Sequence, residues 1–448
     1  MKLRIEKAVY GGACLAHVPV AQDTGDAAAS GKTVFVPYSL PGELVEARVT
    51  DERRSFANGE LESVIEASPD RVQPGCEYFP ACGGCQYQHA AGGYQLRMKA
   101  EILADTFRRA HVGEAFEAAA PLGMLAGPPW GYRNRIRVQV VAAPDGQSIS
   151  LCYRERGTHS SLAIGHCPIA APLIERAMAE VLRIGREAGL ARLCNEMEFF
   201  SNGDESELLI GLLDGTGRDR VHGAPRQKTL DRFSEQLKAQ LPELAGVGIL
   251  STEARTPRLA NLWGQSSLRY SVLDRSYQVS LGSFFQINRF LLPEFVSLVI
   301  GGRSGRRAWD LYAGVGLFSR GLNFERVVAV EAALSSSGDL KQNLEGTGHR
   351  AVSSTTLDFL RAQAGKPPRE SPELIVLDPP RAGLGPEICR HLDRIAAAAM
   401  VYVSCDPATL ARDLQALLQS RYRLESIHLI DLFPQTFHLE TVAVLARR

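Results

Sequence analysis

The pattern of hydrophobic and polar positions differs between the two ends of the chain. Residues 1 to about 68 contain short runs that alternate apolar and polar residues, such as TVFVPYSL and ELVEARV, with turn residues at Pro41-Gly42 and Asn58-Gly59. Short strands at this spacing predict a small β-barrel. The polar stretch 21–32 within this region predicts a mobile loop.

From about residue 285 the pattern changes to apolar strands that alternate with helices. The strand-like runs are RAWDLYAG, RVVAVEA, ELIVLDPP, MVYVSCDP, ESIHLIDLFP and TVAVLARR, with helices expected near FSRGL, PEICRHLDRIA and ATLARDLQALL. This alternation predicts an α/β fold with a doubly wound, mostly parallel sheet, whose ligands bind beyond the carboxyl ends of the strands. Asp310, Glu331, Asp378 and Cys405 fall at such ends.

Length and composition add a domain division to this picture. A chain of 448 residues with 45% hydrophobic and 22% charged residues is typical of several globular domains. We expect a barrel at 1–68, a mixed α+β central domain at 69–284 and a catalytic domain at 285–448. Residues 94–112 have helical periodicity.

The net charge and the apolar content of the chain limit which binding partners and which location we expect for the protein. Fifty basic and fifty acidic residues give no net charge, so a polyanion would need a local patch. In GYRNRIRVQVV, strand alternation would put Arg133, Arg135 and Arg137 on one face, and we predict RNA contact there; ordinary ion pairs on a solvated strand face are the alternative. Without a run of 18 apolar residues or a signal peptide, we expect a cytoplasmic protein without a membrane anchor.

Three of the nine cysteines crowd into GCEYFPACGGCQYQH. Five residues separate Cys76 from Cys82, and two separate Cys82 from Cys85. An odd number of cysteines in a chain without an export signal argues against a disulfide framework. The spacing predicts a metal centre, and thiolates suit both zinc and iron–sulfur clusters.

A nucleoside cofactor is indicated after the first strand of the C-terminal region. Gly314 and Gly316 form a strand-to-helix turn that lets a ligand approach the backbone. Glu331, 21 positions after Asp310, closes the next strand, where an acid can hold ribose hydroxyls. Because position 319 is Ser, the third glycine of a pyrophosphate site is missing, so a ligand such as S-adenosylmethionine fits better.

Two further strand ends carry reactive groups. The Asp378-Pro379-Pro380 loop carries an acid into the cleft, and Arg381 stands where methyltransferases acting on exocyclic amines usually have an aromatic residue. Cys405 precedes a helix whose positive end favours a thiolate. Such a thiolate could add to carbon 6 of a flipped-out uracil and activate carbon 5.

The C-terminal run FPQTFHLE supplies a candidate for the base that the second half of the reaction requires. After methyl transfer, a carboxylate must remove the carbon 5 proton before the thiolate departs. Glu440 is the candidate base, and His438 is better interpreted as structural support. A methyltransferase acting on an amine or a ribose would not need Cys405, and an RNA-binding protein with incidental methylation is a rival of a different class.

Together these motifs resemble the RNA uracil-5-methyltransferase family, in its branch with a TRAM domain and an iron–sulfur cluster. The resemblance covers nearly the whole chain and rests on GKTVFVPYSLPGELVEARV, CEYFPACGGCQYQH, GHCP, SFFQINRF, DLYAGVGLFS, VVAVE, VLDPPRAG, VSCDPATLARD and FPQTFHLE. It implies a Rossmann-like catalytic sheet, S-adenosylmethionine as methyl donor, and ribosomal RNA as substrate with tRNA as the alternative. We also expect a monomer.

The resemblance also implies roles for individual residues. Gln286, Tyr312 and Glu331 should contact S-adenosylmethionine, and Asp378 should lie between cofactor and uracil. Cys405 should be the nucleophile and Glu440 the base. The ligands of a [4Fe–4S] cluster should be Cys76, Cys82, Cys85 and, in GHCP, Cys167. The helix at about 93–125 should pack on the catalytic domain, and Leu317, where well-known members have Asn, puts one cofactor contact in doubt.

Overall fold

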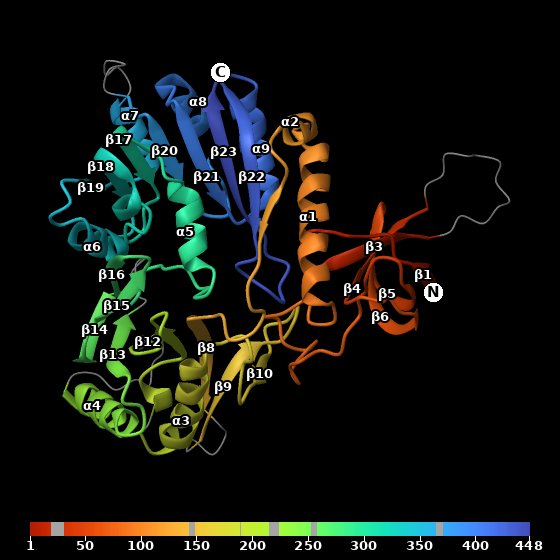
Figure 1. The fold of residues 1–448 in the computed structure, drawn as a ribbon. Coiled ribbons are helices and arrows are strands. Elements are labelled where there is room, and N and C mark those ends of the chain that lie inside the picture. Colours follow the sequence, from red (N-terminus) through yellow and green to blue (C-terminus); the bar gives the residue numbers. More distant parts are fainter. Residues whose placement is uncertain (19–30, 143–147, 189, 215–223, 252–257, 364–370) are drawn as a thin grey trace, which may run out of the picture.

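The protein is built on four β-sheets (Figure 1). The computed structural model describes residues 1–18, 31–142, 148–188, 190–214, 224–251, 258–363 and 371–448. In chain order the sheets have six, seven, two and eight strands. Among the described helices, none is long and apolar enough to cross a membrane.

The N-terminal sheet has the strand order β1-β5-β6-β4-β3-β2, and most of the predicted 21–32 loop lies outside the described residues. Its strands are β1 Lys2–Arg4, β2 Lys7–Ala8, β3 Ala13–His17, β4 Thr33–Pro37, β5 Leu44–Glu52 and β6 Phe56–Glu66. The turn predicted at Asn58-Gly59 is wrong, because both residues lie inside β6. A Cβ on Gly59 would lie 3.3 Å from Val34, so this glycine lets β4 approach β6 closely.

The central sheet has the order β10-β9-β8-β11-β12-β13-β14. Its strands are β8 Arg135–Ala142, β9 Ile149–Arg154, β10 Ser161–Ala163, β11 Glu196–Ser201, β12 Leu208–Asp214, β13 Leu244–Ser251 and β14 Arg258–Gly264. Helices α3 Pro172–Ala188 and α4 Ala224–Lys238 pack on it, and a hairpin of β15 Ser267–Val272 and β16 Arg275–Ser280 follows. Sequence periodicity does not separate these elements, since strands such as β11 and β12 are buried on both faces and lack a regular alternation of apolar and polar residues.

The C-terminal sheet has the order β19-β18-β17-β20-β21-β23-β22-β7. Its strands are β17 Ser304–Leu311, β18 Asn323–Glu331, β19 Arg350–Ser353, β20 Leu374–Leu377, β21 Ala399–Ser404, β22 Tyr422–Ile430, β23 Glu440–Arg447 and β7 Gly123–Leu125. The strands from β19 to β21 in this order are parallel and β23 is antiparallel, which confirms the predicted mostly parallel α/β sheet.

Helices flank this sheet (Figure 1). They are α5 Leu292–Ile300, α6 Leu334–Asn343, α7 Thr356–Gln363, α8 Gly385–Ile395 and α9 Pro407–Leu418. The helix expected near FSRGL is only a single 3-10 turn, Ser319–Gly321, because the chain enters β18 two residues later. Sequence analysis did not predict β19 or α7.

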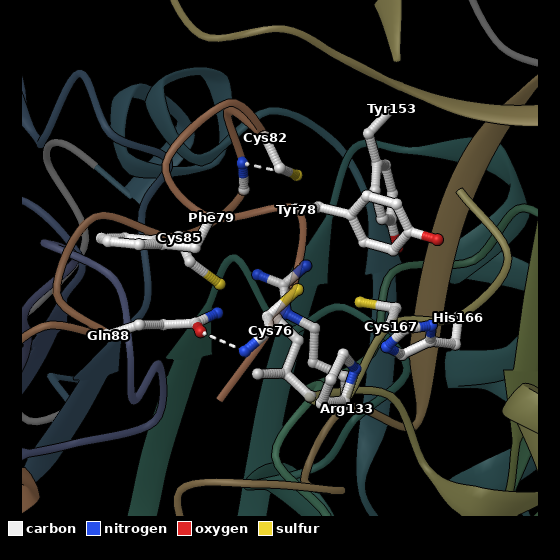
Figure 2. Close-up of a pocket in the computed structure, with 13 residues that line it drawn as sticks. Cys76, Tyr78, Phe79, Cys82, Cys85, Gln88, Arg133, Tyr153, His166 and Cys167 are labelled. Carbon is white, nitrogen blue, oxygen red and sulfur yellow. Dashed lines mark hydrogen bonds between the residues drawn. The ribbon is translucent and has the colours of Figure 1, made fainter. Parts of the chain in front are cut away.

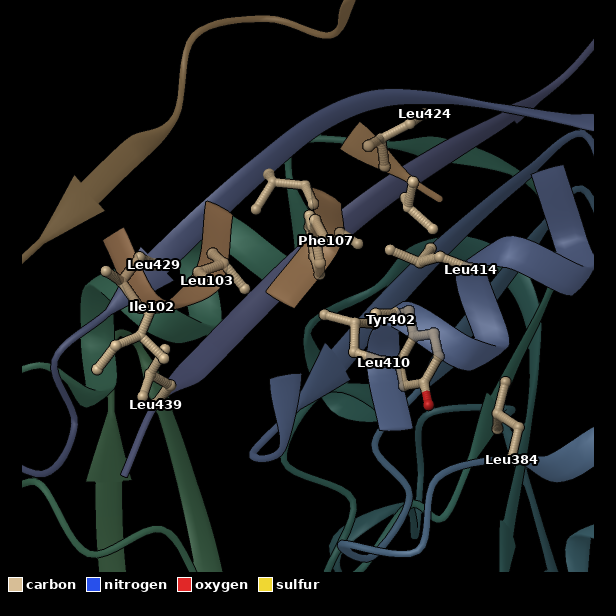
Figure 3. Packing of buried hydrophobic residues seen from close by; sticks show 14 of the residues in the cluster. Ile102, Leu103, Phe107, Leu384, Tyr402, Leu410, Leu414, Leu424, Leu429 and Leu439 are labelled. Carbon is tan, nitrogen blue, oxygen red and sulfur yellow. The ribbon is translucent and has the colours of Figure 1, made fainter. Parts of the chain in front are cut away.

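A helix from early in the chain packs against the late sheet. Helix α1 Gly92–Arg109 is followed by α2 Gly113–Ala118 and by β7, which pairs with β22. Ile102, Leu103 and Phe107 lie on one face of α1 and share a buried cluster with residues of α9 and β22 (Figure 3). Each such fully buried side chain contributes about 1.5–3 kcal/mol. The segment before the central sheet is therefore part of the C-terminal layer.

Candidate active site and cysteine cavity

A large cavity lies beyond the carboxyl ends of the parallel strands. Including its open mouth, it measures about 1900 Å³. The residues predicted for cofactor binding and catalysis all line it: Gln286, Tyr312, Gly314, Glu331, Asp378, Cys405 and Glu440. They come from five strand ends and the segment after β16, which the parallel topology brings to one edge of the sheet.

The glycine turn after β17 is shaped for a ligand. Gly314 has φ +56°, and a Cβ there would meet nothing within 4 Å, so its backbone is open to the cavity. Its N–H donates to Glu331 Oε2 at 2.8 Å, and Ala333 N–H donates to Glu331 Oε1 at 2.6 Å. Gly316 has φ +89°, and a Cβ there would lie 2.8 Å from Leu340 of α6. One glycine thus exposes the backbone, and the other lets the turn pack.

Acidic side chains concentrate at this end of the cavity. Asp310 is fully buried, and it accepts a 2.5 Å hydrogen bond from the Ser319 hydroxyl at Oδ2, while Oδ1 has no partner among the described residues. Burial raises the pKa of Asp310 to about 7. Burial, with the charges of Asp310 and Glu331, raises the pKa of Asp378 to about 7 as well. A cationic ligand would relieve this repulsion, and the sulfonium and amino groups of S-adenosylmethionine are cationic.

Apolar and aromatic side chains line the rest of the cavity. Leu317 is buried, and its carbonyl accepts a hydrogen bond from the Tyr277 hydroxyl at 3.0 Å, so it is a packing residue of the turn. Gln286 is held through its carbonyl, which accepts from Asn134 Nδ2 at 3.1 Å. Phe284 is 62% exposed although it lines the cavity. Sequence reasoning did not single out Phe284; its position two residues before Gln286 was the available signal.

Cys405 lies between β21 and α9. Asp406 caps α9 by accepting hydrogen bonds from Ala408 N–H and Thr409 N–H at 3.0 and 2.9 Å. The helix end was expected to favour a thiolate, but burial and the charge of Glu440 raise the pKa of Cys405 to about 11. The charge of Arg381 opposes this rise. The resting group is therefore a thiol, which must lose its proton before it can act as a nucleophile.

Glu440 begins β23 and is almost fully buried. Burial and the charge of Asp378 raise its pKa well above the ordinary value. Arg381 Nη2 lies 2.9 Å from His438 Nδ1, and burial together with Arg381 lowers the pKa of His438 to about 3. His438 is thus a neutral acceptor that orients Arg381, in agreement with the supporting role expected for it.

The N-terminal sheet reaches the active site through Tyr10. Its hydroxyl donates to the carbonyl of Cys405 at 3.3 Å, and its ring packs edge-on against Phe437 at 5.5 Å. Sequence analysis did not identify Tyr10, because nothing in a local pattern links residue 10 to residue 405.

A second cavity is lined by the four predicted metal ligands. Cys76, Cys82, Cys85 and Cys167 surround it, with the Arg133 side chain among them (Figure 2). None of the four is in a disulfide. Burial raises the pKa of the Cys85 thiol to about 12 and that of Cys167 to about 11, so a bound cation would have to stabilise the thiolates.

Arg135 and Arg137 lie on one face of β8, as predicted, but with Arg133 they do not form the free patch expected to contact RNA. Arg133 lines the cysteine cavity, and Arg135 stacks at 3.8 Å over Phe200 and donates to a carbonyl at 2.5 Å. Arg137 is 49% exposed but pairs with Glu198 at 2.9 Å. The three side chains do not form one free surface, because those of Arg133 and Arg135 point to groups inside the protein.

The parallel sheet, the open glycine turn and the acid at the end of the next strand define a Rossmann-like methyltransferase. The family model described as tRNA (Uracil-5-)-methyltransferase matches residues 95–448, and the TRAM domain model matches residues 3–61. The chain belongs to the tRNA (uracil-5-)-methyltransferase family. It is an S-adenosylmethionine-dependent RNA uracil-C5-methyltransferase with a TRAM domain, which confirms the resemblance seen in the motifs.

Individual relatives match over nearly the full length. The chain is 31% identical to a 23S rRNA (uracil(1939)-C(5))-methyltransferase RlmD of Shewanella amazonensis, covering 94% of this chain and 92% of that protein. It is 28% identical to an uncharacterized RNA methyltransferase of Thermotoga maritima, covering 100% and 99%. The crystal structure of Pyrococcus abyssi tRNA (uracil-54, C5)-methyltransferase in complex with S-adenosyl-L-homocysteine has the same fold, with a TM-score of 0.72 at 20% identity and 100% of each chain covered.

Proposed function

We propose that Cys405 is the nucleophile and Glu440 the base in the formation of 5-methyluridine. The observation that carries this proposal is that a thiol and a buried carboxylate line one cavity with the glycine turn and Asp378. Cys405 loses its proton to solvent and adds as a thiolate to carbon 6 of uracil, and the displaced electron pair of the double bond between carbons 5 and 6 makes carbon 5 nucleophilic. Gln286, Tyr312, Glu331 and the backbone of Gly314 would hold S-adenosylmethionine, which would supply the methyl group.

The remaining steps fall to the protein. Glu440 removes the proton from carbon 5, the electron pair of that bond restores the double bond between carbons 5 and 6, and Cys405 leaves as thiolate. Asp378, which lines the same cavity, would lie between cofactor and uracil and accept hydrogen bonds from one of them. The pKa of Glu440, raised by burial and by the charge of Asp378, makes its carboxylate a stronger base than an ordinary glutamate, which suits a group that must take up a proton.

The product tests this reaction directly. Purified protein should convert uridine in an unmodified transcript to a nucleoside whose added methyl group stays with the base on fragmentation. A methyl group that fragments with the ribose, or activity retained by Cys405→Ala, would support a ribose methyltransferase instead.

We further propose that the substrate is 23S ribosomal RNA. Relatives named for 23S rRNA are 30–31% identical over 94% of this chain, and this supports the assignment. The fold shared with the Pyrococcus abyssi tRNA enzyme favours tRNA as the second candidate. Methylation of 23S rRNA and tRNA transcripts, compared at equal concentration, decides between them; faster methylation of tRNA would reverse the assignment.

We also propose that Cys76, Cys82, Cys85 and Cys167 hold a [4Fe–4S] cluster. Four thiols around one cavity suit such a cluster. Such a cluster would tie the 76–85 segment to residue 167. Anaerobically purified protein should contain iron and sulfide; stoichiometric zinc without iron would contradict this proposal.

A further inference from the structure

The segment that leads to Glu440 is joined to the cysteine segment at Gln435. This residue is 4% exposed and adopts φ +69°. Its carbonyl accepts hydrogen bonds from the N–H groups of Gln86 and Tyr87, both at 2.9 Å. Gln86 directly follows Cys85, which lines the cysteine cavity. The residue that follows a cavity-lining cysteine is therefore hydrogen-bonded to the segment that carries the candidate base.

Gln95 of α1 holds the same residue from the other side. It is 1% exposed, its Oε1 accepts from Gln435 N–H at 2.9 Å, and its Nε2 lies 2.9 Å from Gln435 Oε1. The same Nε2 lies 3.1 Å from the carbonyl of Tyr87 and 2.9 Å from that of Ala90. One buried amide thus joins α1, the end of the cysteine segment and the segment before β23.

Other contacts hold the two ends of this segment: Asn288 Nδ2 donates to the carbonyl of Leu432 at 3.1 Å, and Glu440 pairs with Ile430 between β23 and β22. Lys99 Nζ donates to Asp431 Oδ1 at 2.7 Å and to the carbonyl of Phe433 at 3.0 Å, and the Tyr132 hydroxyl donates to the carbonyl of Pro434 at 3.0 Å. These contacts fix the first half of the segment. At its centre, Gln95 supplies both side-chain hydrogen bonds made to Gln435 among the described residues.

We propose that Gln95 is a positioning residue for methyl transfer: it fixes Gln435, and through it the placement of Glu440 over the uracil ring. The proposal rests on the assignment of Glu440 as base. It also gives the cysteine segment a part in catalysis, because Gln86 and Tyr87 bind the same residue. Displacement of a catalytic group by about 1 Å can reduce a rate on the order of 100-fold.

The expected defect is specific to one step. Gln95→Leu removes the amide at nearly constant size, so Gln435 N–H and Oε1 lose their partners and the segment 435–440 gains freedom. Proton removal uses Glu440 of this segment directly, whereas addition of Cys405 depends on the segment only through the contact of His438 with Arg381. The variant should therefore accumulate methylated RNA bonded to Cys405, with kcat lowered about 10- to 100-fold. Its affinity for S-adenosylmethionine should stay within about twofold of the parent, since no cofactor-binding residue has moved.

The test compares Gln95→Leu with Thr106→Val and Glu440→Gln, all in the full-length protein. Thr106→Val is the matched control on α1, because it removes one side-chain hydrogen bond that stays within the helix, to the carbonyl of Ile102. The readouts are the covalent RNA adduct on a denaturing gel, and amide hydrogen exchange of the 431–440 segment. We expect adduct and faster exchange for Gln95→Leu, and neither for Thr106→Val.

The outcomes separate the two assignments. If Glu440→Gln traps adduct but Gln95→Leu does not, the positioning role is wrong while the base assignment stands. If Glu440→Gln traps none, the base assignment is wrong and the positioning role falls with it. Unchanged exchange of 431–440 in Gln95→Leu also overturns the positioning role, whatever the adduct shows. Thermal unfolding shows whether Gln95→Leu is folded, and Gln95→Glu, which keeps the acceptor for Gln435 N–H, is the second variant if it is not.

Discussion

At the residue scale, the candidate active site contains thiol and carboxyl groups whose charged forms are disfavoured by burial. Cys405, Glu440, Asp378 and Asp310 all have raised pKa values, so each keeps its proton to a higher pH than an ordinary thiol or carboxyl group. Such clustering of perturbed groups is typical of an active site. The sequence predicted Asp378 and Cys405 as site residues because they follow strand ends, and Glu440 because it precedes the last strand, but it could not predict their protonation, which depends on burial.

The first prediction concerns the pH dependence of activity. Because the thiolate is the reactive form and the pKa of Cys405 is about 11, kcat/KM should rise with pH up to at least pH 9. Glu440 acts in the same direction, since its base form also increases with pH. Arg381→Gln removes the charge that lowers the pKa of Cys405, so it should lower kcat/KM about tenfold at pH 8, and Arg381→Lys should lower it less. A flat profile between pH 6 and 9 would contradict this account.

The second prediction concerns cofactor affinity. Asp310 and Asp378 have pKa values of about 7, so lowering the pH from 8 to 6 protonates them and removes the negative charge that attracts the sulfonium. The Kd for S-adenosylmethionine should therefore rise about tenfold over this range. S-adenosylhomocysteine lacks the sulfonium charge and serves as the control. Calorimetric titration measures both Kd values. If the Kd values of the two ligands change equally with pH, these carboxylates do not attract the sulfonium.

At the element scale, the glycine turn after β17 shows what local sequence could and could not reveal. The pattern located the turn and its acid, Glu331, because strand ends and glycines are visible in one stretch of chain. It did not reveal that the helix expected to follow is only one 3-10 turn. It also misplaced a turn at Asn58-Gly59, because a glycine needed for close strand packing has the same composition signal as one needed for a turn.

The third prediction separates the two glycines of this turn. Gly316→Ala would place a Cβ 2.8 Å from Leu340, so it should destabilise the protein by about 1–3 kcal/mol. Both changes strain a backbone with positive φ, but Gly314→Ala meets no such contact because its Cβ enters the open cavity, so it should weaken S-adenosylmethionine binding more than it lowers stability. Chemical denaturation and ligand titration measure the two effects. Equal effects of the two variants on both quantities would show that the turn does not divide these roles.

At the scale of the whole molecule, distant segments complete one site. The N-terminal sheet contacts Cys405 through Tyr10, and α1 and the cysteine segment meet at Gln435. Motif reasoning placed the catalytic residues because they lie within one alternating region. It could not predict Tyr10, Gln95 or Gln435, since their roles arise from contacts across more than 300 residues of sequence.

The central claim is that Cys405 is the nucleophile and Glu440 the base. Trapping the covalent intermediate tests it most directly. Cys405→Ala should give neither product nor adduct, because carbon 5 is never activated. Glu440→Gln keeps the nucleophile and removes the base, so methylated RNA should remain bonded to Cys405 and survive denaturing electrophoresis. Normal turnover by Glu440→Gln, or methylation of uridine by Cys405→Ala, would contradict the assignment.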